Sequence, residues 1–314
     1  MLSTKIGHLP VVPKVVIIII NWNGKQDTIE CLTSLKKIDY SNFEIIIVDN
    51  ASTDGSIECF RETFPEVTLI GNLQNLGFSG GFNVGIQKAI ERAADYVLCL
   101  NNDTILDRGF LKELVIVGEQ NNDIGGLGPK EYDYSNPKKI IYAGGKIGLI
   151  RSKNYRCGEI DTGQCEKYIK TEMLCGAAIM LKTKALLNIG LFDSDYFFGS
   201  EDKDIAIRLM RSGYNIMYVP SAKFWHKRRG STSGKIGPLN VYFYLRNYLL
   251  LVRKNYEQHE FVIALLPFIF VHIPFFILVS PDRKKCLNSI IMAIKWHIDP
   301  KSLPEDVEIV KKLR

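Results

Sequence analysis

The fold class of this chain is decided by Val15-Val-Ile-Ile-Ile-Ile20 and the Asn21-Trp-Asn-Gly24 that follows it. An uninterrupted β-branched run of this kind is typical of a strand buried on both faces of a sheet. A segment with a helical pattern, Lys25 to Lys37, separates it from a second apolar run, Phe43-Glu-Ile-Ile-Ile-Val48. Strands that alternate with helices indicate a mostly parallel sheet with right-handed crossovers. The sequence therefore predicts an α/β fold with helices on both faces of a central sheet.

Polar side chains follow the predicted strands at the points where they end. They occur at Asn21-Trp-Asn23, at Asp49-Asn-Ala-Ser-Thr-Asp54, and at Asn101-Asn-Asp103 after a strand predicted over Tyr96 to Leu100. In parallel sheets, ligands bind beyond the carboxyl ends of the strands. We therefore expect one composite site at this edge, although each cluster taken singly could be an ordinary turn or helix cap.

A glycine-rich segment, Asn75-Leu-Gly-Phe-Ser-Gly-Gly-Phe-Asn-Val-Gly85, follows a short strand predicted over Val67 to Ile70 and opens a helix that runs to about Ala94. It does not match the Gly-x-Gly-x-x-Gly dinucleotide fingerprint, and the chain has no Gly-Lys-Ser/Thr phosphate loop. A nicotinamide-binding domain is therefore disfavoured. The glycines can also be explained by turn geometry and close helix packing alone.

Three carboxylates gather in the segment Tyr196-Phe-Phe-Gly-Ser-Glu-Asp-Lys-Asp204, at the start of a predicted amphipathic helix. The free amides and the positive end of a helix dipole favour carboxylates there. The apolar residues Ile205, Leu209 and Met210 fall on one helical stripe. We therefore expect this helix to pack on a core and hold the acids rigid. The alternative is that the acids only cap a surface helix.

Taken together, these segments resemble family 2 glycosyltransferases of the GT-A fold, particularly the rhamnosyltransferase-like members, over roughly residues 14 to 255. The resemblance is carried by Asn21-Trp-Asn23, Asp49-Asn-Ala-Ser-Thr-Asp54, Asn75-x-Gly-Phe-x-x-Gly-x-Asn-x-Gly85, Leu100-Asn-Asn-Asp103, Cys175-Gly-Ala-Ala178, Glu201-Asp-x-Asp204 and Trp225-His226. It implies a GT-A domain over residues 1–236 that performs an inverting transfer. A hydroxyl of a glycan or lipid-linked acceptor would attack a dTDP- or UDP-linked sugar, which is rhamnose or another hexose.

The resemblance also implies roles for individual residues. Asp202 would be the general base, and Glu201 and Asp204 would orient the acceptor or support the base. Clustered carboxylates should raise the pKa of at least one of them. Asp49 would accept a hydrogen bond from N3 of a pyrimidine. Four asparagines would line the nucleotide-sugar site: Asn21, Asn23, Asn83 and Asn102. The small residues Gly176 and Ala177, expected on a strand, would leave room for the acceptor.

A divalent cation, Mg²⁺ or Mn²⁺, is implied by the match of Asp103 to the last acid of the family's DxD-type motif, with His226 as the second ligand. Hard oxygen ligands and substrate phosphates suit both ions. Position 101 is Asn, so the motif keeps one carboxylate. The basic loop Lys227-Arg-Arg-Gly-Ser-Thr-Ser-Gly234 would place Arg228 and Arg229 on the diphosphate. The alternative for this loop is a solvated charge run or a nucleic-acid patch; we expect no nucleic-acid partner.

The composition changes after about Pro238, and we expect residues 237–314 to form a helical region that associates with a membrane. Its apolar run, Phe261 to Ser280, is interrupted by Pro267, His272 and Pro274, and basic residues flank both ends. A kinked or interfacial element on the cytoplasmic face fits this pattern better than a clean span. A single span and a buried helical pair are the alternatives. The seven scattered cysteines indicate reduced thiols.

Two other functions compete with the glycosyltransferase prediction. A nucleotidyltransferase would also use an α/β sheet, a metal and acidic residues, but it should carry a glycine-rich loop with Arg or Lys after the first strand. Asn21-Trp-Asn-Gly24 contains no Arg. A non-catalytic nucleotide-sugar-binding protein is the other alternative, and the presence of Asp103, Asp202 and His226 argues against it. The net charge of +6 is modest and does not separate these possibilities.

Overall fold

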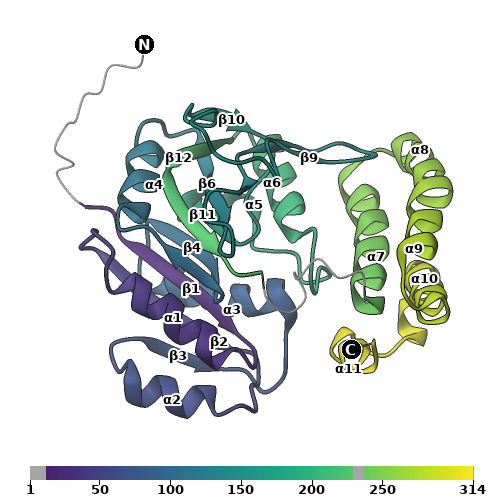
Figure 1. Ribbon diagram of the computed structural model, residues 1–314, viewed down its shortest axis with the longest axis horizontal. Helices are drawn as coiled ribbons and strands as arrows, with labels where there is room; N and C mark the ends of the chain where they lie inside the picture. The colour runs from purple at the N-terminus through teal and green to yellow at the C-terminus, as the bar shows by residue number, and fades with distance from the viewer. Residues whose placement is uncertain (1–11, 229–236, 314) are drawn as a thin grey trace.

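The computed structural model describes residues 12–228 and 237–313, and its centre is a ten-stranded sheet in the order β10-β12-β6-β11-β4-β1-β2-β3, with β5 on β12 and β7 on β6 (Figure 1). β1 pairs in parallel with β2 and β4, whereas β11 runs antiparallel between β4 and β6. The predicted α/β fold is confirmed. The strands are β1 (Val15–Asn21), β2 (Phe43–Asp49), β3 (Thr68–Gly71), β4 (Tyr96–Asn101), β5 (Thr104–Leu106), β6 (Ile124–Asp133), β7 (Ile140–Tyr142), β10 (Ile169–Thr171), β11 (Ala178–Lys182) and β12 (Asn215–His226), with a separate hairpin of β8 (Gly145–Lys146) and β9 (Lys153–Asn154).

Helices cover both faces of the sheet, as Figure 1 shows. The side chains of Val15, Ile17 and Ile19 join a core with α1, α2 and α4 on one face. Those of Val16 and Ile18 join a second core with α3, α5 and α6 on the other face. The continuous β-branched run thus forms a strand buried on both sides. The helices are α1 (Lys25–Leu35), α2 (Ser56–Thr63), α3 (Gly77–Glu91), α4 (Phe110–Gly118), α5 (Thr183–Ile189) and α6 (Glu201–Arg211).

The strand register brings the polar clusters to one edge of the sheet. Asn21 lies opposite Asp49 in the β1–β2 ladder, and Ile20 lies opposite Asn101 in the β1–β4 ladder. The last residue of β12, His226, lies opposite Thr104 of β5, which directly follows Asp103. Segments separated by up to 200 residues therefore converge where the parallel strands end, as the sequence predicts.

Several predicted boundaries differ from the observed ones. The first helix ends at Leu35 rather than Lys37, the helix after the glycine-rich segment ends at Glu91 rather than Ala94, and the short strand begins at Thr68 rather than Val67. Helix ends are set by capping contacts that local patterns describe poorly. The prediction that Gly176 and Ala177 lie on a strand is wrong, because β11 begins only at Ala178 and the residues before it form a turn.

Close packing explains one of the glycines in the segment after β3. A Cβ atom added to Gly85 would lie 2.4 Å from Cγ2 of Ile18, so α3 approaches β1 more closely than any larger residue permits. Gly77 adopts a φ of 72° at the start of α3, and its neighbour Phe78 donates its N–H to the Phe197 carbonyl over 2.7 Å. These glycines therefore serve helix packing and turn geometry.

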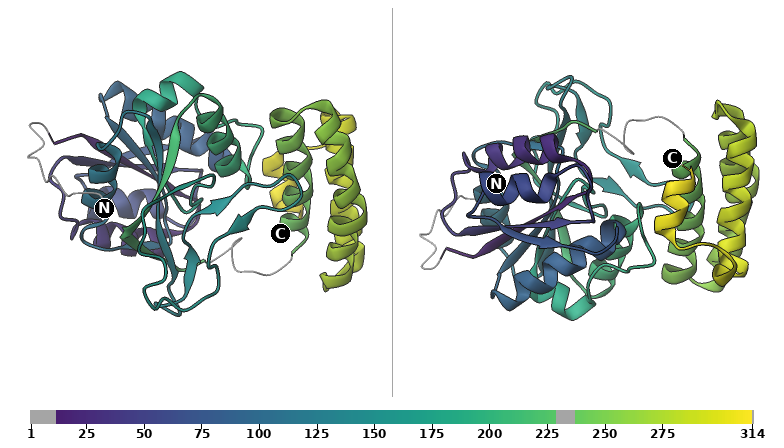
Figure 2. Two further views of the ribbon diagram at one scale, coloured as in Figure 1. Left: turned by 90° about the horizontal axis from the view of Figure 1, so that it is seen from above. Right: turned by 90° about the horizontal axis from the view of Figure 1, so that it is seen from below.

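The C-terminal helices form a separate layer at one side of the sheet and its covering helices (Figures 1 and 2). They are α7 (Pro238–Asn255), α8 (Gln258–Pro267), the π-helical turn η2 (Phe268–His272), α9 (Ile273–Val279), α10 (Arg283–Ile298), the 3₁₀ turn η3 (Pro300–Ser302) and α11 (Asp306–Leu313). The inner helix α7 packs on α10 and on the segment before α6. It also contacts the tip of the β8–β9 hairpin, because the hydroxyl of Tyr248 on α7 donates to the carbonyl of Leu149 at that tip over 3.2 Å.

Helices α8 and α9 continue through η2 as one run, Gln258–Val279, which is long and apolar enough to cross a membrane; its most apolar 18-residue window has a mean hydropathy of 2.7. Only 28% of its most apolar window is buried within the protein. Its buried stripe consists of Ala264, Phe268, His272 and Phe276. The exposed apolar side chains are Val262, Ile263, Leu266, Ile269, Phe270, Val271, Phe275, Leu278 and Val279. The run is therefore apolar around nearly its whole circumference, although only one side has a protein partner.

Candidate active site

The first corner of the site lies where β1 and β2 end. Asp49 is fully buried, and its carboxylate accepts a hydrogen bond from Nδ2 of Asn21 at 2.7 Å and from the backbone N–H of Ser52 at 2.8 Å. Asn21 is also fully buried and donates a second bond to the Ser52 hydroxyl at 3.0 Å. A buried carboxylate needs such donors. The two residues predicted to bind the base thus form one rigid unit.

Asn23 and Asn102 border this unit. Asn23 adopts a φ of 51°, and its side-chain oxygen accepts the backbone N–H of Thr53 at 2.8 Å. Asn102 follows β4 and donates to the Thr28 hydroxyl at 3.0 Å, which itself donates to Asn21. These predicted nucleotide-sugar residues are therefore brought together with Asp49 by one hydrogen-bond network.

Asn83 is placed differently, on the second turn of α3. Its amide donates to the Phe192 carbonyl at 2.8 Å and accepts the Phe192 N–H at 3.0 Å. Both polar atoms of the side chain thus tie α3 to the segment after α5. The nucleotide-sugar role given to Asn83 remains a prediction, whereas its structural role is explicit.

The second corner joins Asp103 and His226, the two predicted metal ligands. Nε2 of His226 lies 3.0 Å from Oδ1 of Asp103, and both residues are buried. On the other side of the ring, Nδ1 lies 2.7 Å from Oε1 of Glu131, which is buried as well. Burial disfavours the charged imidazole, but the hydrogen bonds with Asp103 and Glu131 outweigh it and raise the pKa of His226 to about 9.

This corner has the chemistry of a partial cation site. Within residues 12–228 and 237–313, no group of three or more His, Cys, Asp or Glu side chains is placed to hold a metal ion. Asp103 and His226 nevertheless supply one hard oxygen and one imidazole nitrogen side by side, with Glu131 behind the ring as in many metal-binding histidines. The donors fit a Mg²⁺ or Mn²⁺ ion whose other ligands come from a substrate diphosphate and water.

The basic loop after β12 is described only at its beginning. Nζ of Lys227 is nearly fully buried and pairs with Asp27 at 2.8 Å and Glu30 at 2.5 Å, both on α1. Arg228 follows with a φ of 54°. Arg229 and the rest of the loop lie outside the described residues. Lys227 therefore anchors the start of the loop to α1, and the diphosphate role of Arg228 and Arg229 remains a prediction.

The third corner is the start of α6, where the carboxylates Glu201, Asp202 and Asp204 lie in the first turn. Ile205 and Leu209 are fully buried against the sheet, so the helix is fixed as predicted. Oδ1 of Asp202 accepts the Lys203 N–H at 2.9 Å. A Cβ atom added to Gly176 would lie 3.3 Å from Oδ2 of Asp202, so this carboxylate oxygen faces the turn before β11. The predicted base and the predicted acceptor turn are adjacent.

Burial also shifts the pKa values of two carboxylates in this turn. It raises the pKa of Asp202, and together with repulsion from Asp202 it raises the pKa of Glu201 to about 8. Oε2 of Glu201 is buried without a hydrogen-bond partner among the described residues. The expectation that at least one clustered carboxylate has a raised pKa thus agrees with the geometry. Glu201 is held in an environment that favours its protonated form.

Asp204 has both carboxylate oxygens in use. Oδ2 accepts from Nε of Arg208 at 2.8 Å, and Oδ1 accepts from Nδ2 of Asn255, the last residue of α7, at 2.8 Å. Because Asp204 is buried, these bonds also satisfy its charge. Of the two roles predicted for Asp204, supporting the base fits these contacts better than touching the acceptor.

Helix α7 clamps the segment that leads into the acids. Nδ2 of Asn247 donates to the carbonyls of Phe198 at 2.8 Å and Gly199 at 2.6 Å. The fully buried Arg246 donates to the Asp195 carbonyl at 2.7 Å and pairs with both carboxylate oxygens of Asp306 at 2.6 Å. The turn being held is unusual, since Gly199 and the non-glycine Ser200 both have φ above 70°. The C-terminal helices thus help to define the acidic turn.

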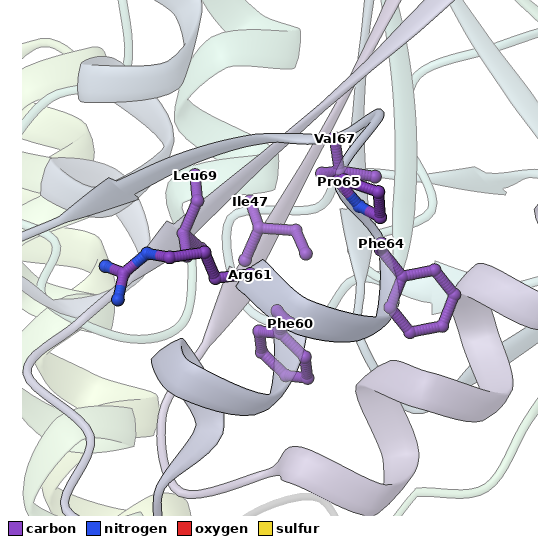
Figure 3. A pocket seen from close by; sticks show the side chains of 7 residues that line it. All are labelled: Ile47, Phe60, Arg61, Phe64, Pro65, Val67 and Leu69. Atoms are coloured by element: carbon purple, nitrogen blue, oxygen red, sulfur yellow. The ribbon is translucent and has the colours of Figure 1, made fainter.

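A well-enclosed cavity elsewhere does not belong to this site. It has a volume of about 190 Å³ and lies between α2 and the sheet, as Figure 3 shows. Its lining is apolar apart from Arg61, and it includes Phe60 of α2 and Phe64 and Pro65, which lie in the connection that leads into the amino-terminal end of β3. The ligand edge is at the other end of the strands. Location and chemistry both exclude this cavity as the catalytic centre.

The sequence analysis did not identify Glu131, Ser52 or Asn247 as site residues. Glu131 lies in the second half of β6, 95 residues from His226, and the two meet only because β6 and β12 pair in parallel. Asn247 lies within an apolar, aromatic helix, and no local sequence pattern marks it as a site residue. Ser52 belongs to the cluster after β2 and was within reach of the sequence argument.

Known structures share this fold. A mannosyltransferase from Pyrobaculum calidifontis, solved in complex with GDP-Man and Mn²⁺, aligns with a TM-score of 0.60 at 16% identity over 93% of this chain and 89% of its own. GalNAc-T7, solved with UDP, GalNAc and Mn²⁺, aligns with a TM-score of 0.66 at 16% identity over 93% of this chain and 57% of its own. At such identities the likeness shows the fold, and these neighbours confirm the GT-A architecture.

Sequence relatives point to the same class. The N-acetylglucosaminyl-diphospho-decaprenol L-rhamnosyltransferase of Mycobacterium tuberculosis is 26% identical over 220 residues, which are 64% of this chain and 72% of the relative. A poly-beta-1,6-N-acetyl-D-glucosamine synthase of Staphylococcus aureus is also 26% identical, over 64% of this chain and about half (47%) of the synthase. The family model described as glycosyl transferase family 2 matches residues 16–190, more than half of the chain. The chain belongs to glycosyl transferase family 2.

Proposed function

We propose that this chain is an inverting glycosyltransferase with Asp202 as its general base. The observation that carries the proposal is the position of the Asp202 carboxylate, which is fixed at the start of α6 and faces Gly176 in the turn before β11. That turn lies at the same sheet edge as Asp49 and Asp103. An acceptor hydroxyl seated against Gly176 and Ala177 would meet the base on one side and the donor sugar on the other.

The burial of Asp202 supports this role. Burial raises the pKa of Asp202 and so makes its carboxylate a better proton acceptor. Asp202 would take the proton of the acceptor hydroxyl as the oxygen attacks the anomeric carbon and the nucleoside diphosphate leaves from the opposite side. One displacement inverts the anomeric configuration. Asp204, held by Arg208 and Asn255, keeps the first turn of α6 in place.

Asp103 and His226 would hold a divalent cation, Mg²⁺ or Mn²⁺, and such a cation neutralises charge on a departing diphosphate. Neighbouring residues hold Asp103 and His226 in position. Glu131 holds the far side of the His226 ring, and the Lys227 N–H donates to the Asp103 carbonyl at 2.9 Å, which joins the start of the basic loop to the same corner. Arg228 and Arg229 would add positive charge at the diphosphate.

The donor would be a nucleoside diphosphate sugar with a pyrimidine base. Each oxygen of the Asp49 carboxylate accepts one hydrogen bond within the protein, and a carboxylate oxygen has capacity for another. Asp49 would therefore accept from N3–H of uracil or thymine once the side chains that cover it move aside, because it is fully buried here. The name of the rhamnosyltransferase relative supports rhamnose as the transferred sugar. The contact with Asp49 is compatible with dTDP- and UDP-linked donors alike.

The acceptor would be a glycan or a lipid-linked saccharide at the cytoplasmic face of the membrane. The name of the M. tuberculosis relative includes a diphospho-decaprenol acceptor, and the exposed apolar run of α8 and α9 supports attachment to a lipid surface. Large exposed apolar patches mark interaction sites. Arg283, Lys284 and Lys285 at the start of α10 are exposed and would favour anionic headgroups. The run would lie in the interface rather than cross it.

The proposal is tested in two stages. A panel of UDP-, dTDP- and GDP-sugars with Mn²⁺ is first screened by thermal shift, because a bound donor raises the apparent stability. The stabilising donor is then incubated with an N-acetylglucosaminyl diphospholipid, and the anomeric configuration of the product is read by NMR. Transfer with inversion supports the proposal. A product with the configuration of the donor, or donor binding without any transfer or hydrolysis, would reject it.

A further inference from the structure

One buried carboxylate connects two parts of the site. Oε1 of Glu131 lies 2.7 Å from Nδ1 of His226, and Oε2 accepts from Sγ of Cys175 at 3.2 Å. Cys175 directly precedes Gly176, which faces Asp202. The contacts therefore run without a break from Asp103 through His226 and Glu131 to the acceptor turn. Glu131, His226 and Cys175 are all buried, so water does not compete for these bonds.

Glu131 is in this position because of strand pairing. It lies opposite Phe224 in the parallel ladder of β6 and β12, two residues before His226. Side chains two residues apart on a strand point to the same face, so the ladder sets the carboxylate beside the ring. Its neighbours on β6 have other partners: Lys130 pairs with Asp161 and Glu166.

The geometry fixes the orientation of the imidazole. The Glu131 carboxylate accepts a hydrogen bond from the N–H at Nδ1, and the opposite nitrogen, Nε2, is then presented to Asp103 at 3.0 Å. Without a partner at Nδ1, the ring can rotate or flip and present the wrong nitrogen. The Cys175 thiol in turn fixes the second oxygen of Glu131, so the carboxylate itself cannot swing away from the ring.

We propose that Glu131 is a positioning residue that aims Nε2 of His226 at the cation and diphosphate site and couples this corner to the acceptor turn through Cys175. The inference rests on the proposed function, since it assigns His226 to the cation that accompanies the donor. Glu131 itself touches neither donor nor acceptor. Its effect is therefore on the affinity for the cation and not on proton transfer at Asp202.

The decisive measurement is the affinity of the full-length protein for Mn²⁺ alone, followed by the electron paramagnetic resonance signal of the free ion. Glu131→Leu keeps the volume and removes both hydrogen bonds, and it should weaken Mn²⁺ binding by about 10–100-fold, as is typical for losing a partner of a metal-binding histidine. Glu131→Gln can still accept from Nδ1–H and should remain within a few-fold of the wild type. Glu159→Gln, an exposed acid paired with Arg156, is the matched control and should bind like the wild type.

The Mn²⁺ measurements distinguish a failure of the proposed cation site from a failure of the role proposed for Glu131. A wild-type protein that does not bind Mn²⁺ would reject the cation assignment in the proposed function and this inference with it. A wild type that binds and a folded Glu131→Leu variant that binds equally well would overturn the inference alone. If Glu131→Leu does not fold, Glu131→Asp replaces it. The shorter side chain moves the carboxylate away from His226 by one methylene and should weaken Mn²⁺ binding. An Mn²⁺ affinity equal to that of Glu131→Gln would overturn the inference.

Discussion

The strand-end site and the α8–α9 run are opposites in how they distribute polarity. At the strand ends, charged and amide side chains such as Asp49, Asp103 and His226 are buried, and each has hydrogen-bond partners. In the α8–α9 run, large apolar side chains such as Phe270 and Leu278 are more than 70% exposed. Buried polar groups are stable only when paired, and a wide exposed apolar surface indicates a further partner. The polar groups of the first region are paired within the protein, whereas the second region is where we propose contact with a lipid surface.

Helix α7 connects these two regions. Its inner side clamps the segment before Asp202 through Arg246 and Asn247, and its outer side shares an apolar core with α9 and α10. Arg246 is paired with Asp306 of α11, so even the last described helix contributes to the acidic turn. The layer that would contact lipid and the layer that would hold the base are therefore joined by one helix.

The largest effect should come from Asp202→Asn. The substitution keeps the shape of the side chain and removes its basicity, and a positioned base contributes about 10²–10⁴-fold. We expect turnover to fall by that factor while the donor Kd stays within a few-fold, as measured by transfer assays and by calorimetry. Asp193→Asn, on the same segment, is the control. Retention of more than about a tenth of the wild-type turnover would remove Asp202 from the mechanism.

The next effect concerns the exposed run of α8 and α9. Phe270→Glu with Leu278→Glu should reduce partitioning to anionic liposomes by on the order of 100-fold, because each large apolar side chain contributes about 1.5–3 kcal/mol on burial. Leu73→Glu, which lies fully exposed after β3, should have no effect. Truncation after Asn255 is a less informative test of membrane binding, because it also perturbs the fold. It deletes Asp306, the ion-pair partner of the buried Arg246, and it exposes the face of α7 that packs on α10.

The wild-type protein should pellet with membranes and need detergent for release. Protease protection of residues 301–313 in sealed inverted vesicles would contradict the interfacial placement, because it would put the C-terminal helix across the bilayer. Release by salt alone would contradict the apolar contribution of α8 and α9.

Removal of the cation should affect only the strand-end region. Asp103→Ala and His226→Ala should each weaken donor binding in the presence of Mn²⁺ by at least about tenfold and change it little in EDTA. Titration calorimetry with the donor selected by thermal shift gives both values, and Asp107→Asn, an exposed turn residue, is the control. If the EDTA-treated enzyme is fully active, Asp103 and His226 do not serve a cation, and the basic loop carries the diphosphate charge.

Asn247→Ala should show that α7 acts on the acidic turn. The variant leaves the carbonyls of Phe198 and Gly199 without their donor, and it should lower the free energy of unfolding by about 1–3 kcal/mol. Turnover should fall more than donor affinity, because the turn carries the base and not the donor. Arg253→Ala, exposed on the same helix, is the control. Equal losses of donor affinity and turnover would indicate a general loss of structure.

The smallest effect on turnover is expected at Glu201, which should instead give the stability a pH dependence. Its pKa is raised by burial and by Asp202 from 4.5 to about 8, so the folded state holds this proton more tightly than the unfolded state. The associated stability is fully present below pH 4.5 and is lost as the pH rises toward 8. Glu201→Gln should therefore flatten the decline in stability between pH 5 and 8, as measured by urea unfolding. Parallel curves of stability against pH for the wild type and Glu201→Gln would exclude Glu201 as the source of this pH dependence.

Local patterns were enough for several conclusions. The β-branched run at Val15–Ile20 predicted a strand buried on both faces, and the periodicity of Ile205 and Leu209 predicted a helix fixed to the core. The clusters at Asn21, Asp49 and Asp103 predicted a shared site, because parallel strands end at the same edge. The family followed from the order of these motifs, and the family model that matches residues 16–190 confirms it.

Other features depended on the tertiary structure. Glu131 and His226 are 95 residues apart, Asp204 and Asn255 are 51 apart, and no spacing in the chain signals either pair. The sequence likewise marked Phe261 to Ser280 as apolar, but only the packing of α7 and α10 decides which side chains are covered and which are exposed. Secondary structure follows from the periodicity of neighbouring residues, so the sequence by itself determines it and the fold class. Side-chain partners follow from strand register and helix packing, which fix distances between residues remote in the chain, and only the folded structure decides them.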